Sequence, residues 1–323
     1  MQLYLPLAEM SVNLFLLLGM GLAVGFLSGM FGIGGGFILT PMLIFLGVPP
    51  ALAVGTGASQ VVASSVSSAL KHWQRDNVDL KMGAFLIVGG LVGALSGVQV
   101  VSWLRAAGQL DLFVSLSYII LLGVIGTLML IESLRTMHAA QAQSGPVRRG
   151  KHHSWIQGLP LKQRFPASRL YISTIPPVAI GIFVGWLTAI MGIGGGFLLV
   201  PALIYLLGMP TRIVIGTSVF QVVFVTALTT VLQAVQNNAV DLVLGIPLML
   251  GGVIGANYGV DLAERLKAEQ LRVLLALLVI AVAIRMAIGL VVTPRELYSI
   301  EQAPPAEVAG QPAPRPRATV RNP

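Results

Sequence analysis

The sequence predicts an all-α integral membrane protein with two homologous halves of about five hydrophobic segments each. Three observations predict this fold class. Of the 323 residues, 55% are hydrophobic and 10% are charged, whereas a soluble domain carries about 25% charged residues. Apolar runs long enough to enter a bilayer recur along the chain. Two of these runs are followed by the same glycine-rich hexapeptide, which predicts helices that are broken at membrane depth.

The glycine-rich stretch occurs once in each half. The first copy reads Gly-Ile-Gly-Gly-Gly-Phe over residues 32–37 and is followed by Pro41, and the second reads the same over residues 192–197 and is followed by Pro201. Four glycines in five residues disfavour a helix, because glycine costs about 1 kcal/mol relative to alanine at each interior position. Unwound backbone is tolerated in hydrocarbon only where protein buries it or where it lines a cavity. We therefore interpret the two loops as parts of a binding site.

Further matches extend the internal repeat well beyond the loops. Gly55-Thr56 recurs as Gly216-Thr217, Gln60 recurs as Gln221, and Val78-Asp79-Leu80 recurs as Val240-Asp241-Leu242. A duplication that extends along most of each half predicts two structural units related by symmetry. The predicted organisation is a first transmembrane repeat over residues 11–131, a basic cytoplasmic linker over 132–174, a second transmembrane repeat over 175–292 and a disordered tail over 293–323.

Cations gather in the predicted linker, where seven Lys and Arg residues stand against the single acid Glu132. Apolar side chains are interleaved with these cations over residues 155–165, which favours a short helix at the membrane interface. His152 and His153 are adjacent, but a lone histidine pair on a basic loop is typical of solvated side chains. We therefore predict no metal site there.

Loop charge predicts how the halves are oriented. The loop over residues 71–81 carries three Lys and Arg residues and its counterpart over 236–240 carries none, whereas Arg105 alone follows the fourth segment and its counterpart is rich in cations. Under the positive-inside rule the halves then face opposite ways, as inverted repeats with five crossings each and both termini outside. If the short segments 37–47 and 197–208 instead dip in without crossing, each half crosses four times and the repeats are parallel.

The glycine loops are the first candidate site. A helix that begins at Phe37 or Phe197 points unpaired N–H groups at the loop, and the helix dipole adds partial positive charge, which suits an anion. The alternative is close helix packing, which we favour for Gly89, Gly93 and Gly97 because they are spaced by four. The predicted binding residues of the loops are Gly34, Gly35, Gly36, Phe37, Gly194, Gly195, Gly196 and Phe197.

Polar side chains at helical spacing form the second candidate set. Thr56 and Gln60 are four residues apart, as are Thr217 and Gln221, so each pair lies on one helix face. Neutral donors of this kind can hold an anion without a fixed cation, although hydrogen bonds between helices would use the same residues. Both interpretations stay open, and all four residues are included in the predicted substrate-binding set.

The duplicated glycine motif with its following proline, trailed in each half by Gly-Thr and Gln, resembles the sulfite exporter TauE/SafE family of membrane permeases. The resemblance covers nearly all of residues 14–292. It implies transport of small sulfur-containing anions, such as sulfite or organosulfonates, across a bacterial inner membrane. We therefore expect a multi-pass secondary transporter, with export as the expected direction, that works by alternating access around a midplane site.

Two function classes are alternatives to a secondary transporter. An anion channel could use the same scaffold, and a membrane enzyme could act on a lipid-linked phosphate. Such an enzyme needs grouped acid, base or metal-binding residues, and the apolar segments contain no such group of His, Asp or Glu. We therefore predict no enzymatic activity, no catalytic residue, no metal and no cofactor. The expected partners are a small anion, the lipid bilayer and a coupling proton, with no nucleic acid; the oligomeric state stays open.

Overall fold

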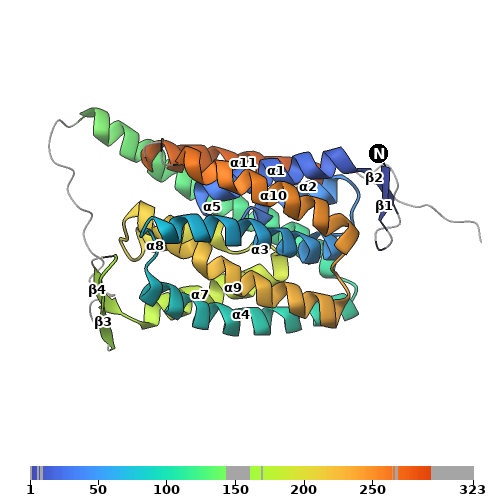
Figure 1. Cartoon of the computed structure of the whole chain (residues 1–323), viewed down its shortest axis with the longest axis horizontal. Helices are drawn as coiled ribbons and strands as arrows, with labels where there is room; N and C mark the ends of the chain where they lie inside the picture. The colour runs from blue at the N-terminus through green and yellow to red at the C-terminus, as the bar shows by residue number, and fades with distance from the viewer. Residues whose placement is uncertain are drawn as a thin grey trace, which may run out of the picture.

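The protein is a bundle of long helices with a small β-hairpin at each end (Figure 1). The computed structural model describes residues 2–5, 7, 10–142, 161–168, 170–263, 265 and 268–291. The helices are α1 (Leu14–Phe31), α2 (Gly36–Phe45), α3 (Pro50–Gln74), α4 (Leu80–Ala106), α5 (Leu110–Ala142), α7 (Ile175–Met191), α8 (Gly196–Tyr205), α9 (Thr211–Asn237), α10 (Leu242–Ala263) and α11 (Ala268–Val291). The strands are β1 (Gln2–Leu5), β2 (Met10–Asn13), β3 (Lys162–Phe165) and β4 (Leu170–Ser173). The predicted all-α membrane fold is confirmed.

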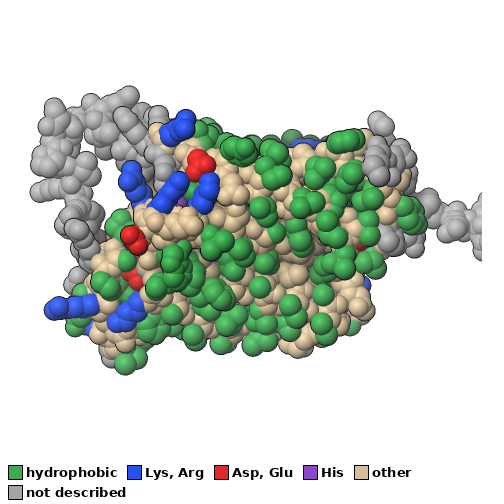
Figure 2. All heavy atoms as spheres, in the orientation of Figure 1, with side chains coloured by type: hydrophobic (Ala, Val, Ile, Leu, Met, Phe, Trp, Pro, Cys, Tyr) green, Lys and Arg blue, Asp and Glu red, His purple; other side chains and the backbone are tan. Residues whose placement is uncertain are grey.

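The outer surface of the bundle is suited to lipid. Among the described residues, α1, α4, α9 and α10 are long and apolar enough to cross a bilayer. Large apolar side chains such as Phe15, Trp103 and Val235 are at least 70% exposed, which is costly in water when such residues form a continuous surface. Figure 2 shows that hydrophobic side chains cover the middle of this face and that charged side chains gather at the end carrying β3 and β4. The chain is a multi-pass membrane protein.

Helices of one half pack mainly on helices of the other half. A Cβ atom built on Gly21 of α1 would lie 2.5 Å from the backbone oxygen of Leu248 in α10, and one built on Gly29 would lie 2.2 Å from that of Ala256. The residue numbers rise together, so α1 and α10 run parallel with their backbones in contact. The equivalent pair, α4 and α7, packs in the same way: a Cβ built on Gly93 would lie 2.0 Å from the oxygen of Ile182. The packing interpretation of the glycines spaced by four is therefore confirmed.

The contact between α1 and α10 should not tolerate a methyl group. We expect Gly25→Ala to lower the free energy of unfolding by about 1–3 kcal/mol, the usual cost of overpacking, because its Cβ would lie 2.1 Å from the backbone oxygen of Gly252. A thermal melt of the purified protein measures the effect. Gly19→Ala is the matched control on the same helix, since nothing lies within 4 Å of its Cβ. Equal melting temperatures for the two variants would contradict the close packing.

The helices at the centre, α3 and α9, are equivalent in the repeat and run antiparallel. Gly55 at the start of α3 faces the backbone of Ala239, just after α9, and Gly216 at the start of α9 faces that of Asn77, just after α3. The hairpins also lie at opposite ends of the bundle: β1 and β2 precede α1 at one end, and β3 and β4 precede α7 at the other (Figure 1). Equivalent elements of the two halves therefore point in opposite directions.

The short segment after each glycine loop is a ten-residue helix that turns back. The loop after α2 returns to the end of the bundle where α1 begins, because a Cβ on Gly47 would lie 3.8 Å from Cε of Met10 in β2. Helices α1 and α2 thus form one hairpin with the glycine loop at its tip. The sequence analysis predicted parallel repeats for the case in which the short segments dip into the membrane without crossing it. In the structure α2 returns to the end of the bundle where α1 begins, so the next helix, α3, runs parallel to α1.

The predicted linker differs from the observed structure. Helix α5 continues to Ala142, beyond the predicted boundary at residue 131. The interfacial helix predicted over residues 155–165 is wrong for its last four residues, which form strand β3 and pair with β4. Alternating side chains of a short amphipathic strand and of a short interfacial helix are hard to tell apart by sequence. Residues 143–160 and 292–323, which include the whole predicted tail over 293–323, lie outside the described residues.

Candidate anion-binding site

Positive backbone φ angles shape both glycine loops. Gly32 ends α1 in the left-handed conformation, with its N–H donating to the carbonyl oxygen of Ser28 at 2.8 Å, and Gly35 precedes α2 in the same conformation. Only glycine adopts such angles without strain. The φ angles of Gly32, Gly34 and Gly35 are 68°, 83° and 71°, and those of Gly192, Gly194 and Gly195 are 67°, 78° and 70°. The two loops therefore have the same shape because they have the same glycines.

The two loops cross each other at backbone contact. A Cβ atom on Gly36 would lie 2.3 Å from the carbonyl oxygen of Gly192, and one on Gly196 would lie 2.6 Å from the carbonyl carbon of Ile33. Neither glycine has a positive φ angle, so the crossing alone excludes a side chain at these two positions. Residues that are 160 positions apart in the sequence are thereby brought to one point.

The crossing lies halfway along the central helices. Val61 near the middle of α3 and Val222 near the middle of α9 both border it: a Cβ on Gly34 would lie 3.1 and 3.2 Å from their Cγ1 atoms. Gly194 of the other loop approaches the same two side chains. Since α3 and α9 extend toward both ends of the bundle, the loops meet near its middle depth.

Two helix N-termini meet beside the crossing. Phe37 and Phe197, second residues of α2 and α8, stack with their ring centroids 5.7 Å apart and are almost wholly buried. The first N–H groups of a helix have no partner within that helix, and the aligned peptide dipoles leave partial positive charge at its N-terminus. The structure thus brings two helix N-termini together. Within the loops, the N–H groups of Gly36 and Ile38 donate to the carbonyl oxygens of Gly34 and Gly35, and that of Leu198 donates to the carbonyl oxygen of Gly195.

Gln60 and Gln221 are buried carboxamides without a hydrogen-bond partner in the protein. Both side chains are 0% exposed, and both the nitrogen and the oxygen of each amide are unpaired. Each glutamine directly precedes a valine that borders the loops. Their Nε2 atoms lie over glycines of the opposite half, at 2.5 Å from a Cβ built on Gly252 in α10 and 2.7 Å from one built on Gly90 in α4.

Unpaired buried amides are uncommon and costly. More than nine in ten buried polar groups are hydrogen-bonded, and each unpaired group costs about 1–3 kcal/mol. Two such amides at equivalent positions of both halves therefore indicate a site for a polar ligand. The prediction that these glutamines bind the substrate stays a prediction, and this feature is its strongest support.

Thr56 and Thr217 have a structural task that the sequence did not reveal. The Oγ1 atom of Thr56 accepts a hydrogen bond from the backbone N–H of Asp241 at 3.0 Å, and that of Thr217 accepts one from the N–H of Asp79 at 2.9 Å. The two aspartates cap the N-termini of α10 and α4. Each threonine thus ties its helix to the turn before a helix of the other half. Their predicted role in binding the substrate remains untested.

Replacing one threonine hydroxyl should destabilise the protein. We expect Thr56→Val to lower the free energy of unfolding by about 1–3 kcal/mol, because the buried N–H of Asp241 loses its acceptor. Thr56→Ser, which keeps the hydroxyl, should recover most of this loss. Thermal melts of both variants measure the difference, and equal loss in the two would show that the hydrogen bond of the Thr56 hydroxyl does not account for the effect.

Two hydroxyl residues behind the loops, Ser28 and Thr188, were not predicted from the sequence. The Cβ atom of Ser28 lies 3.1 Å from a Cβ atom built on Gly35. The Oγ1 atom of Thr188, the equivalent residue of the other half, lies 2.6 Å from a Cβ atom built on Gly195. Ser218 donates its hydroxyl to the carbonyl oxygen of Gly32 at 2.9 Å. The signal was present, since Ser28 and Thr188 both stand four residues before the first glycine of their loop.

Two arginines that stand in or beside apolar helices, Arg285 and Arg212, do not lie at the crossing of the loops. Arg285 lies over the ring of Phe45, with its guanidinium carbon 4.3 Å from the ring centroid, and Arg212 is exposed at the start of α9. Within the described residues, no group of three or more His, Asp or Glu side chains could hold a metal ion. The site at the crossing is therefore built from neutral groups.

Comparison with known proteins decides the family. The family model described as Sulfite exporter TauE/SafE matches residues 17–286, which includes both glycine loops and all four central polar residues. The chain belongs to the TauE/SafE family. The resemblance recognised from the duplicated motif is thus confirmed.

Relatives of the chain match most of its length in two cases and about a third of it in another. A "Probable membrane transporter protein" of Xylella fastidiosa is 31% identical over 276 residues, covering 84% of this chain and 94% of the relative. YunE of Bacillus subtilis, also named as such a transporter protein, is 26% identical over 275 residues, covering 83% and 94%. "Sulfite exporter TauE/SafE family protein 3" of Arabidopsis thaliana is 29% identical over 122 residues, covering 36% and 26%. No solved structure matches the chain.

Proposed function

We propose that this membrane transporter is a secondary transporter that exports small sulfur-containing anions, such as sulfite or organosulfonates, by alternating access. The crossing glycine loops, with Gln60 and Gln221 beside them, would form its midplane site. The observation that carries this proposal is the pair of wholly buried carboxamides that lack any partner in the protein. The family match supports a transporter, and the bilayer of a bacterial plasma membrane is the proposed setting.

The chemistry of the site suits a small oxyanion. An oxyanion presents several acceptor oxygens, and the site offers carboxamide N–H groups together with the N-termini of α2 and α8. Because these groups are neutral dipoles, they stabilise the anion without binding it as strongly as a fixed cation would. A transporter needs this balance, since the anion must also leave. We propose that a coupling proton, where one is used, travels on the anion.

Alternating access is supported by the antiparallel course of equivalent helices. We propose that the halves are inverted repeats that exchange their conformations when the site changes the side to which it opens. Cations at one end of the bundle support placing that end in the cytoplasm, by the positive-inside rule. The described cations at that end are Lys71, Arg75, Lys81, Lys162, Arg164, Arg212 and Arg265.

Flux measurements in proteoliposomes test the proposal. Purified protein in liposomes loaded with sulfite should show saturable efflux, and external sulfite should accelerate exchange of labelled sulfite. Thermal melts should show stabilisation by the transported anion, because a ligand that binds only the folded state raises its apparent stability. Ohmic anion conductance without counterflow would show that the protein is a channel and not a transporter. Absence of both flux and stabilisation with sulfite, thiosulfate, sulfoacetate and taurine would overturn the proposed substrate class.

A further inference from the structure

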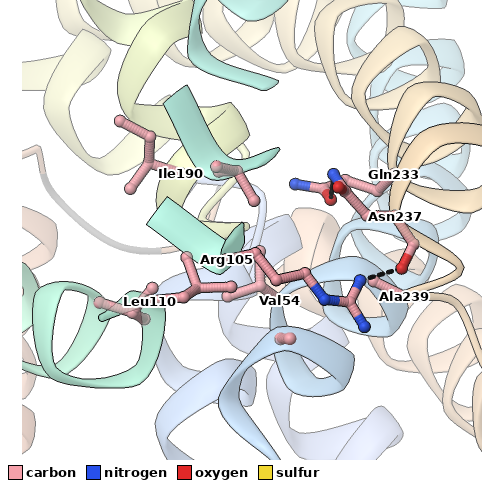
Figure 3. A pocket seen from close by; sticks show the side chains of 10 residues that line it. Val54, Arg105, Leu110, Ile190, Gln233, Asn237 and Ala239 are labelled. Carbon is pink, nitrogen blue, oxygen red and sulfur yellow. Dashed lines mark hydrogen bonds between the residues drawn. The ribbon is translucent and has the colours of Figure 1, made fainter. Parts of the chain in front are cut away.

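A narrow pocket opens at the end of the bundle opposite the cation-rich end. It is lined by residues at the start of α3, at the end of α4, at the start of α5 and at the ends of α7 and α9. Figure 3 shows its polar side, where Arg105, Gln233 and Asn237 converge, facing the apolar side chains of Leu110 and Ile190. The interior has room for about one water molecule at most, so a ligand would be held at the mouth.

The floor of this pocket reaches the second glycine loop. Val54 and Ile190 line the pocket. The backbone oxygen of Val54 lies 2.5 Å from a Cβ built on Gly192, and Ile190 stands two residues before that glycine. The pocket therefore lies between the outside of the bundle and the crossing of the loops.

Arg105 gives the mouth of the pocket its charge. The side chain is exposed, and its Nη1 donates a hydrogen bond to the backbone carbonyl oxygen of Asn237. A guanidinium has five N–H donors, so one bond to a neutral acceptor leaves most of them for another ligand. Both salt bridges found among the described side chains involve Asp261, which pairs with Lys71 at 2.8 Å and Arg75 at 3.1 Å at the other end. Arg105 takes part in neither.

A chain of hydrogen bonds joins Arg105 to the region of the loop. The Nδ2 of Asn237 donates to Oε1 of Gln233 at 2.7 Å, and Nε2 of Gln233 donates to the carbonyl oxygen of Ala189 at 3.0 Å. Ala189 stands three residues before Gly192 in the sequence. The polar wall of the pocket is thus held in place, and its fixed geometry presents the guanidinium at the mouth. At the same rim the N-termini of α3 and α5 add partial positive charge and the C-termini of α4 and α9 add partial negative charge, so the guanidinium supplies the net charge of the mouth.

We propose that the mouth of this pocket is an outer binding site for the transported oxyanion, with Arg105 as its cationic ligand. This proposal rests on the proposed transport of small anions and adds a second, charged site to the neutral site at the loops. Under the proposed orientation the outer site faces away from the cytoplasm. It receives the anion as it leaves the midplane site, and its charge favours release from the membrane interior toward the outside.

Two substitutions test the charge of Arg105. Arg105→Lys keeps the charge on a side chain of similar length, whereas Arg105→Gln removes the charge and is also too short to reach the carbonyl oxygen of Asn237. We expect Arg105→Gln to raise the KM for sulfite exchange roughly tenfold, as loss of a charge-assisted contact predicts, with little change in maximal rate. Arg105→Lys should stay near wild type. Arg212→Gln removes an exposed arginine from the opposite end and is the matched control. KM values near wild type in both the Lys and Gln variants would show that Arg105 only caps α9, and would overturn the site.

Chemical protection gives a readout that does not depend on transport. Phenylglyoxal modifies exposed arginines, and peptide mass spectrometry measures the extent at each one. The probes are sulfoacetate and sulfate, because sulfite itself adds to phenylglyoxal. Either anion should protect Arg105 and leave Arg212 unprotected. Modification of Arg105 that is the same with and without both anions overturns the outer site.

The double variant Gln60→Met/Gln221→Met distinguishes failure of the outer site from failure of the proposed function. If both proposals hold, the variant loses transport while the anion still protects Arg105. Normal transport in the variant overturns the midplane site and leaves protection of Arg105 as a separate result. Lost protection in the wild-type protein, together with intact sulfite counterflow, overturns the outer site alone.

Discussion

Replacing Gln60 and Gln221 together by methionine is expected to abolish anion transport without lowering the melting temperature. Methionine has about the volume of glutamine but no amide. In the folded protein both carboxamides are wholly buried and unpaired, so their removal deletes a desolvation cost of about 1–3 kcal/mol each. The melting temperature should therefore stay constant or rise. Most core substitutions lower stability and activity together, so this opposite response identifies residues that are kept for a ligand.

The expected loss of transport is large because, in the proposed function, each amide donates a hydrogen bond to the transported anion. A hydrogen bond to a charged group contributes about 1.5–3 kcal/mol, and each 1.4 kcal/mol corresponds to a factor of ten in affinity. Losing one such bond per glutamine predicts that binding weakens by at least about 100-fold in the double variant. Counterflow in proteoliposomes and anion-induced thermal stabilisation measure this loss, and each single variant should show part of it.

Gln233 supplies the matched control for stability. Its carboxamide is also buried, but it donates to the carbonyl oxygen of Ala189 and accepts from Asn237. We expect Gln233→Met to lower the free energy of unfolding by about 1–3 kcal/mol, since it leaves buried partners unpaired. If the double variant loses as much stability as Gln233→Met, Gln60 and Gln221 stabilise the packing of helices and do not bind a ligand.

The repeat and the loops could be predicted because identical residues impose identical backbone. Gly34 and Gly194 need positive φ angles that few other residues adopt, so the same string of glycines at two places predicts the same broken helix twice. The reversed loop charges around Arg105 and Arg265 also predict halves that face opposite ways, and the antiparallel course of α3 and α9 supports that prediction.

Contacts between the halves could not be predicted from local patterns. Nothing in the sequence around Thr56 indicates that its partner is the N–H of Asp241, 185 residues away. The β3–β4 hairpin was missed because four-residue strands carry too little periodicity to outweigh a basic, apolar stretch that favours an interfacial helix. Packing also decides that α2 returns to the end of the bundle where α1 begins. The chain between the glycine loop and α3 is too short to carry a sequence pattern that predicts this direction.

Gly36→Ala and Gly196→Ala are expected to produce inserted proteins that neither bind nor transport the anion. Each new methyl group would meet backbone of the other loop, at 2.3 Å from the carbonyl oxygen of Gly192 or 2.6 Å from the carbonyl carbon of Ile33. Backbone cannot rotate away as a side chain can, so the loops must separate. A displacement of about 1 Å in a positioned group can reduce a rate about 100-fold, and here it moves both helix N-termini at once.

Anion-induced stabilisation distinguishes a binding defect from loss of packing in these variants. Both variants should also melt earlier, by the equivalent of about 1–3 kcal/mol, as overpacking predicts. If the crossing serves packing alone, the fraction that stays folded should still be stabilised by the anion and should transport at the normal rate per molecule. Gly123→Ala in α5 is the control, because nothing lies within 4 Å of its Cβ and alanine favours a helix. Loss of anion-induced stabilisation in Gly36→Ala and Gly196→Ala, but not in Gly123→Ala, would place the anion at the crossing of the loops.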